Sequence, residues 1–332
     1  MKRILSGTLT VVVVALMTFA LLQTTFRPAA AQSEDVCYAV ADNGNVSGSA
    51  DTLVTLNKVT GETTLIGYTD TADVEAIAFE PGGTTLYAAN AGQLGVLDLA
   101  TAHFTARPQP FGTGTGAVGD VQFDDVDGLT VDPNTGILYG SQRESGADYD
   151  VLFQIDKSTG AYVPDAFGAG MDYVVVDGPG VLSDIDDIAV DPITGQMYGA
   201  SNAGGNGGVL ISIEQDTGAS SVVGEFGVDD IEGLAFFNDG LLYGSTGKYS
   251  SGPATRNQLY LIDESTGDAT LVASFSQFTD YEGLACLTAP TSISLAGMTA
   301  GSAASPVGWL AVAAMVVMGV VTLVVVRRRV MG

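Results

Sequence analysis

One motif of sixteen residues recurs along the chain and constrains its fold more than any other feature. A complete copy, DIEGLAFFNDGLLYGS, begins at Asp230. Related copies begin at residues 73, 125 and 184, and a shortened copy, DYEGLACLT, begins at residue 280. The starts are 52, 59, 46 and 50 residues apart, a spacing typical of stacked or closed repeat architectures. It fits the four-stranded blade of a β-propeller with loops of variable length.

Each copy predicts four β-strands. The first strand is an apolar run such as IEGLAF, and the second carries Leu-Tyr-Gly; the third and fourth read QLYLID and ATLVASF in the copy at 230. A turn of the form D-x-x-T-G precedes the fourth strand and occurs five times, as NKVTG at 57, DLATA at 98, DKSTG at 156, EQDTG at 214 and DESTG at 263. Glycine supplies positive φ, and Asp or Asn bonds the turn backbone. Five such turns predict five blades in an all-β chain.

The fifth blade is expected to combine strands from both ends of the domain. The copy at 280 stops after its first strand, whereas residues 37–40 (CYAV) align with the second strand of the complete copies. Pairing these segments closes the ring and removes two open sheet edges. Cys37 and Cys286 then lie opposite each other, and two cysteines in an exported domain favour a disulfide. Closing so long a loop contributes at most about 5 kcal/mol to stability.

The repeat resembles that of secreted or surface-displayed bacterial β-propellers with NHL-like repeats. It is most similar to an uncharacterised family with the motif D-x-E-G-L-A-F-x-P-x-T-G-x-L-Y-G, and the resemblance covers roughly residues 37 to 287. This resemblance implies the propeller fold. It implies no particular function, because propellers serve as enzymes, lectins and scaffolds alike.

The two ends of the chain predict export and membrane anchoring. Residues 1–31 combine a basic start, a long apolar run and three alanines, which predicts a cleaved signal peptide, with an uncleaved signal anchor as the alternative. After the ectodomain (32–287) and a small-residue linker (288–306), the uncharged segment 307–326 is long enough for a transmembrane helix. The tail 327–332 begins with three arginines, so we expect it in the cytoplasm and the propeller outside the cell.

The ectodomain is strongly acidic. All 38 acidic residues but only six basic ones lie between Glu34 and Glu282, which gives a net charge of −32. This charge argues against nucleic acid or anionic lipid as a partner of its surface. It is consistent with cation binding, with a salty habitat, or with solubility alone.

Acidic residues stand at the start of every first strand, and we expect them to surround one mouth of the central channel. Oxygen ligands in this setting suit calcium, which makes calcium the candidate cofactor. Two other interpretations are Asx-type caps that terminate each loop, and catalytic carboxylates. The candidate metal ligands are Glu75, Asp127, Asp186, Glu232 and Glu282.

Other side chains offer weaker signals. Arg143, Lys248 and Arg256 lie in loops between second and third strands, on the irregular face where a ligand is expected, and are candidates for contact with an anionic group. The single histidine, His103, lies beside the turn at 98, which leaves no Ser-His-Asp triad or zinc site at the irregular face.

Three functions remain open at this point. The first is a membrane-anchored module, not an enzyme, that binds an extracellular protein or glycan with calcium. The second is a carbohydrate hydrolase with paired carboxylates. The third is a spacer of the cell envelope. Repetition of the acids in every blade favours a structural role over a catalytic pair.

Overall fold

The structure is a computed structural model that describes residues 37–42, 50–143, 149–178, 184–202, 207–247 and 255–287. The predicted signal peptide, linker, membrane segment and basic tail lie outside these residues. The described residues form strands and turns only, and include no helix that could cross a membrane.

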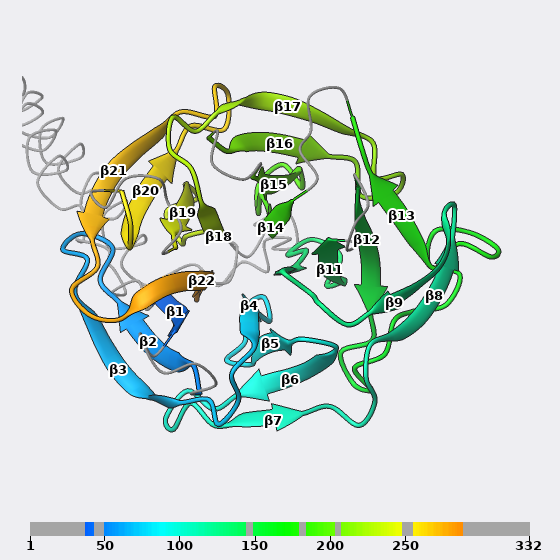
Figure 1. Cartoon of the computed structure of the whole chain (residues 1–332), viewed down its shortest axis with the longest axis horizontal. Helices are drawn as coiled ribbons and strands as arrows, with labels where there is room; N and C mark the ends of the chain where they lie inside the picture. Colours follow the sequence, from blue (N-terminus) through cyan, green and yellow to red (C-terminus); the bar gives the residue numbers. More distant parts are fainter. Residues whose placement is uncertain are drawn as a thin grey trace, which may run out of the picture. The chain divides into compact units, whose positions relative to one another are not determined.

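Five four-stranded antiparallel sheets form a ring around a central channel (Figure 1), which confirms the predicted five-bladed propeller. The innermost strands β4, β10, β14, β18 and β22 contact one another in sequence around the ring. Listed from the innermost strand outward, the first four blades are β4 (Val74–Phe79), β5 (Leu86–Asn90), β6 (Gln93–Leu97) and β7 (Phe104–Ala106); β10 (Gly128–Val131), β11 (Leu138–Arg143), β12 (Asp150–Ile155) and β13 (Tyr173–Val176); β14 (Ile185–Val190), β15 (Met197–Ser201), β16 (Val209–Ile213) and β17 (Ser220–Glu225); and β18 (Ile231–Phe236), β19 (Leu242–Thr246), β20 (Gln258–Ile262) and β21 (Ala269–Ser274).

The fifth blade joins the two ends of the domain, as the sequence predicts. Its order is β22 (Thr279–Cys286), β1 (Cys37–Asp42), β2 (Thr52–Leu56) and β3 (Thr63–Tyr68). In the antiparallel register of β1 and β22, Cys37 lies directly opposite Cys286, and the two form a disulfide. The covalent bond therefore spans the seam of the ring.

The D-x-x-T-G turns show why this sequence recurs. In the turn at 156, one carboxylate oxygen of Asp156 accepts hydrogen bonds from the backbone N–H groups of Ser158 (2.8 Å) and Thr159 (3.1 Å). The same pattern occurs at Asn57, Asp98 and Asp263. These bonds favour the ionised carboxylate and lower the pKa of the three aspartates.

The last residue of each turn has positive φ and presses on the neighbouring blade. These residues are Gly61, Ala102, Gly160, Gly218 and Gly267. A Cβ at Gly61 would lie 2.3 Å from the carbonyl oxygen of Ser274, in the outer strand of the preceding blade. The turn that ends in Ala102 has no glycine at this position, and here the neighbouring blade supplies one. Gly67 of β3 faces this turn, and a Cβ at Gly67 would lie 2.3 Å from the carbonyl oxygen of Thr101. One glycine in each of these contacts lets the blades approach.

Two segments differ from the expected simple crossings. Residues 111–124 contain a hairpin of β8 (Gly112–Gly116) and β9 (Gly119–Phe123), which lies beside β13 at the edge of the ring (Figure 1). The second segment, at 168–183, contains β13, the fourth strand of its blade. In this blade, residues 161–172 separate the D-x-x-T-G turn at 156 from the strand that follows it. Burial of aromatic rings accounts for the hairpin, since Phe123 stacks on Phe153 at 3.9 Å between ring centroids.

Candidate cation site at the channel mouth

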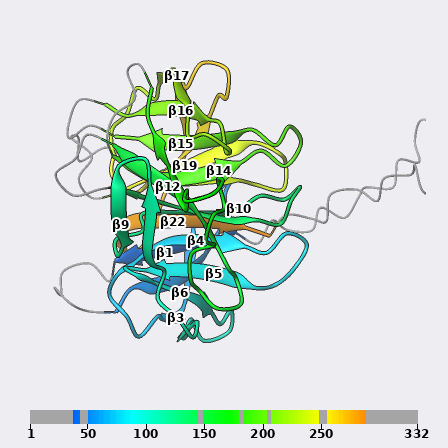
Figure 2. The same ribbon diagram turned by 90° about the vertical axis from the view of Figure 1, so that its right-hand side faces the viewer.

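The innermost strands bring their acidic starts to one end of the channel. The innermost strands β4, β10, β14 and β18 each lead into a tight turn at the opposite end, and Figure 2 shows the turns after β4 and β14 on the same side of the ring. The acidic residues therefore gather at the other end, which we call the channel mouth. Its members are Asp73, Glu75, Asp125, Asp127, Asp184, Asp186, Asp230, Glu232, Asp280 and Glu282.

One group of three carboxylates spans the first two complete blades. Single oxygen atoms of Glu75, Asp125 and Asp127 all lie within 4.8 Å of one another. The Oε2 atom of Glu75 is shielded from solvent and accepts no hydrogen bond. Asp127 Oδ2 accepts one from the backbone N–H of Arg143 at 3.2 Å. The arrangement leaves like charges close together, and the nearby charge of Arg143 compensates for them in part.

The pKa values reflect this crowding. Burial, followed by the negative charge of Asp127, raises the pKa of Glu75 to about 9. Burial also raises the pKa of Asp127 to about 7, although the backbone bond from Arg143 opposes the shift. Without a cation, the pair therefore retains a proton at neutral pH.

A second group lies at the seam between the chain ends. Oxygen atoms of Asp42, Asp280 and Glu282 lie within 4.8 Å of one another. Burial, then the charges of Asp280 and Asp42, raises the pKa of Glu282 to about 10. Asp42 was missed as a candidate because it ends β1, and only the closing register places it beside the start of β22.

The other two predicted ligands have separate surroundings. Asp186 accepts a hydrogen bond from the side-chain amide of Asn202, and burial raises its pKa well above the usual range. Glu232 lies over Gly247, where a Cβ would overlap its carboxylate, and burial followed by the charge of Asp280 raises its pKa. The structure thus groups Glu75 with Asp127, places Glu282 in the second group, and leaves Asp186 and Glu232 outside both.

Caps of the innermost strands come from other residues. Asp51 accepts a hydrogen bond from the backbone N–H of Val74 (2.8 Å), and Asn257 accepts one from that of Asp280 (2.9 Å). Asp150 makes a longer bond of this kind to Ile185 (3.4 Å). All three capping residues come directly before or at the start of a third strand and reach the next blade, a positional signal that sequence reasoning overlooked.

Of the three cations predicted to face a ligand, Arg143 and Arg256 lie within the described residues. Arg143 forms an ion pair with Asp184 across two blades, so its charge is already engaged at the mouth. Arg256 is exposed just before β20, and Lys248 lies outside the described residues.

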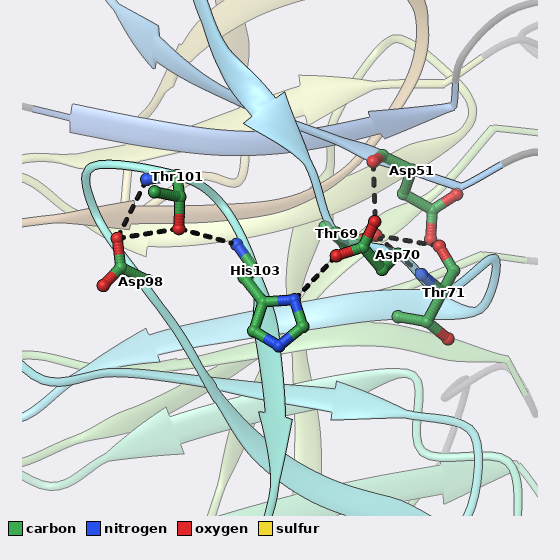
Figure 3. A network of polar contacts seen from close by, with 7 residues as sticks. All are labelled: Asp51, Thr69, Asp70, Thr71, Asp98, Thr101 and His103. Carbon is green, nitrogen blue, oxygen red and sulfur yellow. Dashed lines mark hydrogen bonds and ion pairs between the residues drawn. The ribbon is translucent and has the colours of Figure 1, made fainter.

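His103 belongs to the edge of the ring. Its Nδ1 atom lies 2.6 Å from Asp70 Oδ2, and both side chains are largely exposed (Figure 3). Nearby, the backbone N–H of Phe104 bonds the carbonyl of Thr69, which joins β7 to the end of β3. The hydrogen bond between His103 and Asp70 thus supports the contact between two blades.

A hollow lies at the channel end opposite the mouth. It is lined by the second halves of the innermost strands, residues 77–79, 129–131, 188–190, 234–236 and 284–286, together with Pro81, Pro133 and Pro192. Its side chains are mostly apolar, whereas acidic side chains gather at the mouth.

Comparison with known proteins gives similarity in structure only. No protein-family model and no curated protein matches the sequence. Among solved structures, a nidogen/laminin complex matches with a TM-score of 0.45 and 12% identity, over 77% of this chain and 98% of the other. A putative 6-phosphogluconolactonase of Bacteroides fragilis matches with a TM-score of 0.43 and 12% identity, over 77% and 99% of the two chains. A putative 6-phosphogluconolactonase of Bacteroides uniformis matches with a TM-score of 0.40 and 14% identity, over 76% and 99%. At these scores the similarities assign no ligand or reaction to this chain.

Proposed function

We propose that this protein is a non-enzymatic binding module, displayed outside the cell on a single membrane segment, that binds a protein or glycan partner with calcium at the channel mouth. The observation that carries the proposal is the group formed by Glu75, Asp125 and Asp127, in which one oxygen atom of each side chain lies within 4.8 Å of the others. Holding these like charges together in a partly buried place is costly, and a bound cation would offset their repulsion.

The chemistry of the group favours calcium over softer metals. All the donors are carboxylate oxygens, and calcium accepts six to eight oxygen ligands in flexible geometries. Three carboxylates would leave coordination positions for water or for hydroxyl and carboxylate groups of a partner. A partner that supplies such oxygens, as glycans and acidic peptides do, would then bind through the ion.

Export and anchoring rest on the sequence together with the disulfide. A disulfide between Cys37 and Cys286 persists best in an oxidising compartment, as outside the cell. The predicted signal peptide and the apolar segment 307–326 fit the same placement.

Thermal unfolding with calcium, magnesium or EDTA at fixed ionic strength tests the site. We expect calcium to raise the melting temperature of the purified protein, by the equivalent of about 2.7 kcal/mol at a concentration one hundred times its Kd. The effect should disappear in a Glu75→Gln, Asp127→Asn variant. It should persist in Glu62→Gln, which removes an exposed carboxylate elsewhere.

Two results would contradict the proposal. Equal responses to calcium and magnesium would indicate general screening of the acidic surface. Calcium stabilisation that survives in the double variant would move the ion to another site, with the seam group of Asp42, Asp280 and Glu282 as the next to be changed.

A further inference from the structure

Asp187 interrupts the repeat at a position inside the channel. The residue after the acidic start is small in the other four blades, where it is Ala76, Gly128, Gly233 or Gly283. In β14 it is Asp187, and this side chain is completely buried. An unpaired carboxylate would be very unfavourable there.

The carboxylate of Asp187 is held by three backbone N–H groups from three blades. Asp187 Oδ1 accepts hydrogen bonds from Ile188 of its own strand (2.8 Å) and from Leu129 of β10 (3.3 Å). Asp187 Oδ2 accepts one from Leu234 of β18 (2.7 Å). The side chain therefore links three successive innermost strands.

These donors occupy one repeat position, and the fold explains their convergence. Each innermost strand pairs with a neighbour on one side only, so alternate backbone groups along its other edge face the channel. Leu129, Ile188 and Leu234 are equivalent residues of three blades. The same position is Ile77 in β4 and Leu284 in β22.

We propose that the middle of the channel is an anion site, built from main-chain N–H groups at this repeat position and occupied in this protein by its own Asp187 carboxylate. Converging N–H groups form a concave surface with positive partial charge, which suits a small anion. The chemical class that fits is a small carboxylate such as formate. The inference is independent of calcium at the mouth.

A glycine substitution should expose the site. Asp187→Gly places the usual repeat residue in β14 and leaves three N–H donors without their acceptor, so we expect a lower melting temperature. Sodium formate should restore part of the loss in a saturable manner. Sodium pivalate, with the same charge and a bulky body, should not, and the natural protein should respond equally to both salts at equal ionic strength.

An amide substitution covers the case in which the glycine variant does not fold. Asp187→Asn keeps one acceptor oxygen and replaces the other with an N–H₂ group, which cannot accept a bond. Hydrogen exchange at the amides of Leu129, Ile188 and Leu234 should then accelerate at one or more of these positions, relative to amides of β4.

The proposal would be overturned by either of two outcomes. The first is an Asp187→Gly protein as stable as the natural one, or one that formate and pivalate stabilise equally. The second is unchanged exchange at all three amides in Asp187→Asn.

Discussion

The last residue of the D-x-x-T-G turn shows how a single position holds neighbouring blades together. Gly61 has a φ of 70°, and its Cα faces the backbone of Ser274 without room for a side chain. Gly136, in a turn between β10 and β11, has a φ of 75° but nothing within 4 Å of a Cβ. Substitutions at these two glycines therefore distinguish the cost of backbone strain from the cost of a closer contact between blades.

We expect Gly61→Ala to destabilise the protein more than Gly136→Ala. A left-handed conformation costs an alanine about 1–2 kcal/mol, and this cost applies to both variants. Gly61→Ala adds overpacking against the next blade, which typically costs about 1–3 kcal/mol more. Urea unfolding of both variants measures the difference; equal losses would show that the blades yield to the extra methyl group.

A second prediction concerns Glu282, whose pKa is raised to about 10 by burial and neighbouring acids. Its ionised form is unfavourable in the folded state, so in EDTA at pH 8 Glu282→Gln should raise the free energy of unfolding. At pH 4 the natural side chain is protonated in the folded state and largely protonated in the unfolded state, so most of the gain should vanish. A loss of stability at pH 8 would indicate that the carboxylate makes a favourable bond which glutamine cannot replace.

At the scale of the element, the closing blade depends on one covalent bond. The disulfide links residues 249 positions apart, so it restricts the unfolded chain strongly. A Cys37→Ala, Cys286→Ala variant should lose stability, by about 5 kcal/mol at most in loop-entropy models. Denaturant unfolding measures the loss, and dithiothreitol should produce a comparable loss in the natural protein but none in the variant. Unchanged stability would mean that the strand pairing of β1 with β22 suffices.

The repeat predicts most of these elements, and the exceptions have local causes. Five turns and the split copy at 280 correctly predict five blades and the seam. The sequence does not reveal that β13 follows its turn only after residues 161–172. That insertion is held by Asp172, which accepts bonds from the backbone of Thr115 and Asp165 at 2.8 Å each. The bond from Thr115 joins positions 57 residues apart in sequence, so no short pattern predicts it.

The sequence predicts which acidic residues lie at the channel mouth, but not which of them lie together. The repeat places acids at the start of each innermost strand, and Glu75 and Asp127 indeed come together. The division of the acidic residues into two groups of three depends on how the blades meet in space. The role of Asp187 depends on backbone groups from three blades, which carry no sequence signal of their own.

At the scale of the whole molecule, the buried acids predict how stability depends on pH. Burial raises the pKa of Asp51 and Asp150 to about 7, as it does for Asp127, and that of Glu75 to about 9. The unfolded chain titrates near pH 4, so between about pH 5 and 9 the folded state binds more protons. Stability must then fall as pH rises through this range.

Urea unfolding in EDTA at pH 5, 7 and 9 tests this prediction. We expect the free energy of unfolding to decrease from pH 5 to pH 9, with each group contributing at most about 1.4 kcal/mol per pH unit. Saturating calcium should flatten the decrease if the ion takes the place of the protons. A stability that rises toward pH 9 would contradict the raised pKa values.

The seam also sets the order in which the molecule can be completed during synthesis. β1 is among the first strands to be made and β22 is the last, so the inner edge of β1 has no partner until nearly the whole domain exists. Pairing of segments so distant in sequence is slow, and an unpaired strand edge can associate with other chains. The edge of β1 therefore stays open until residue 286 has been made, and formation of the disulfide between Cys37 and Cys286 marks the moment when the ring is complete.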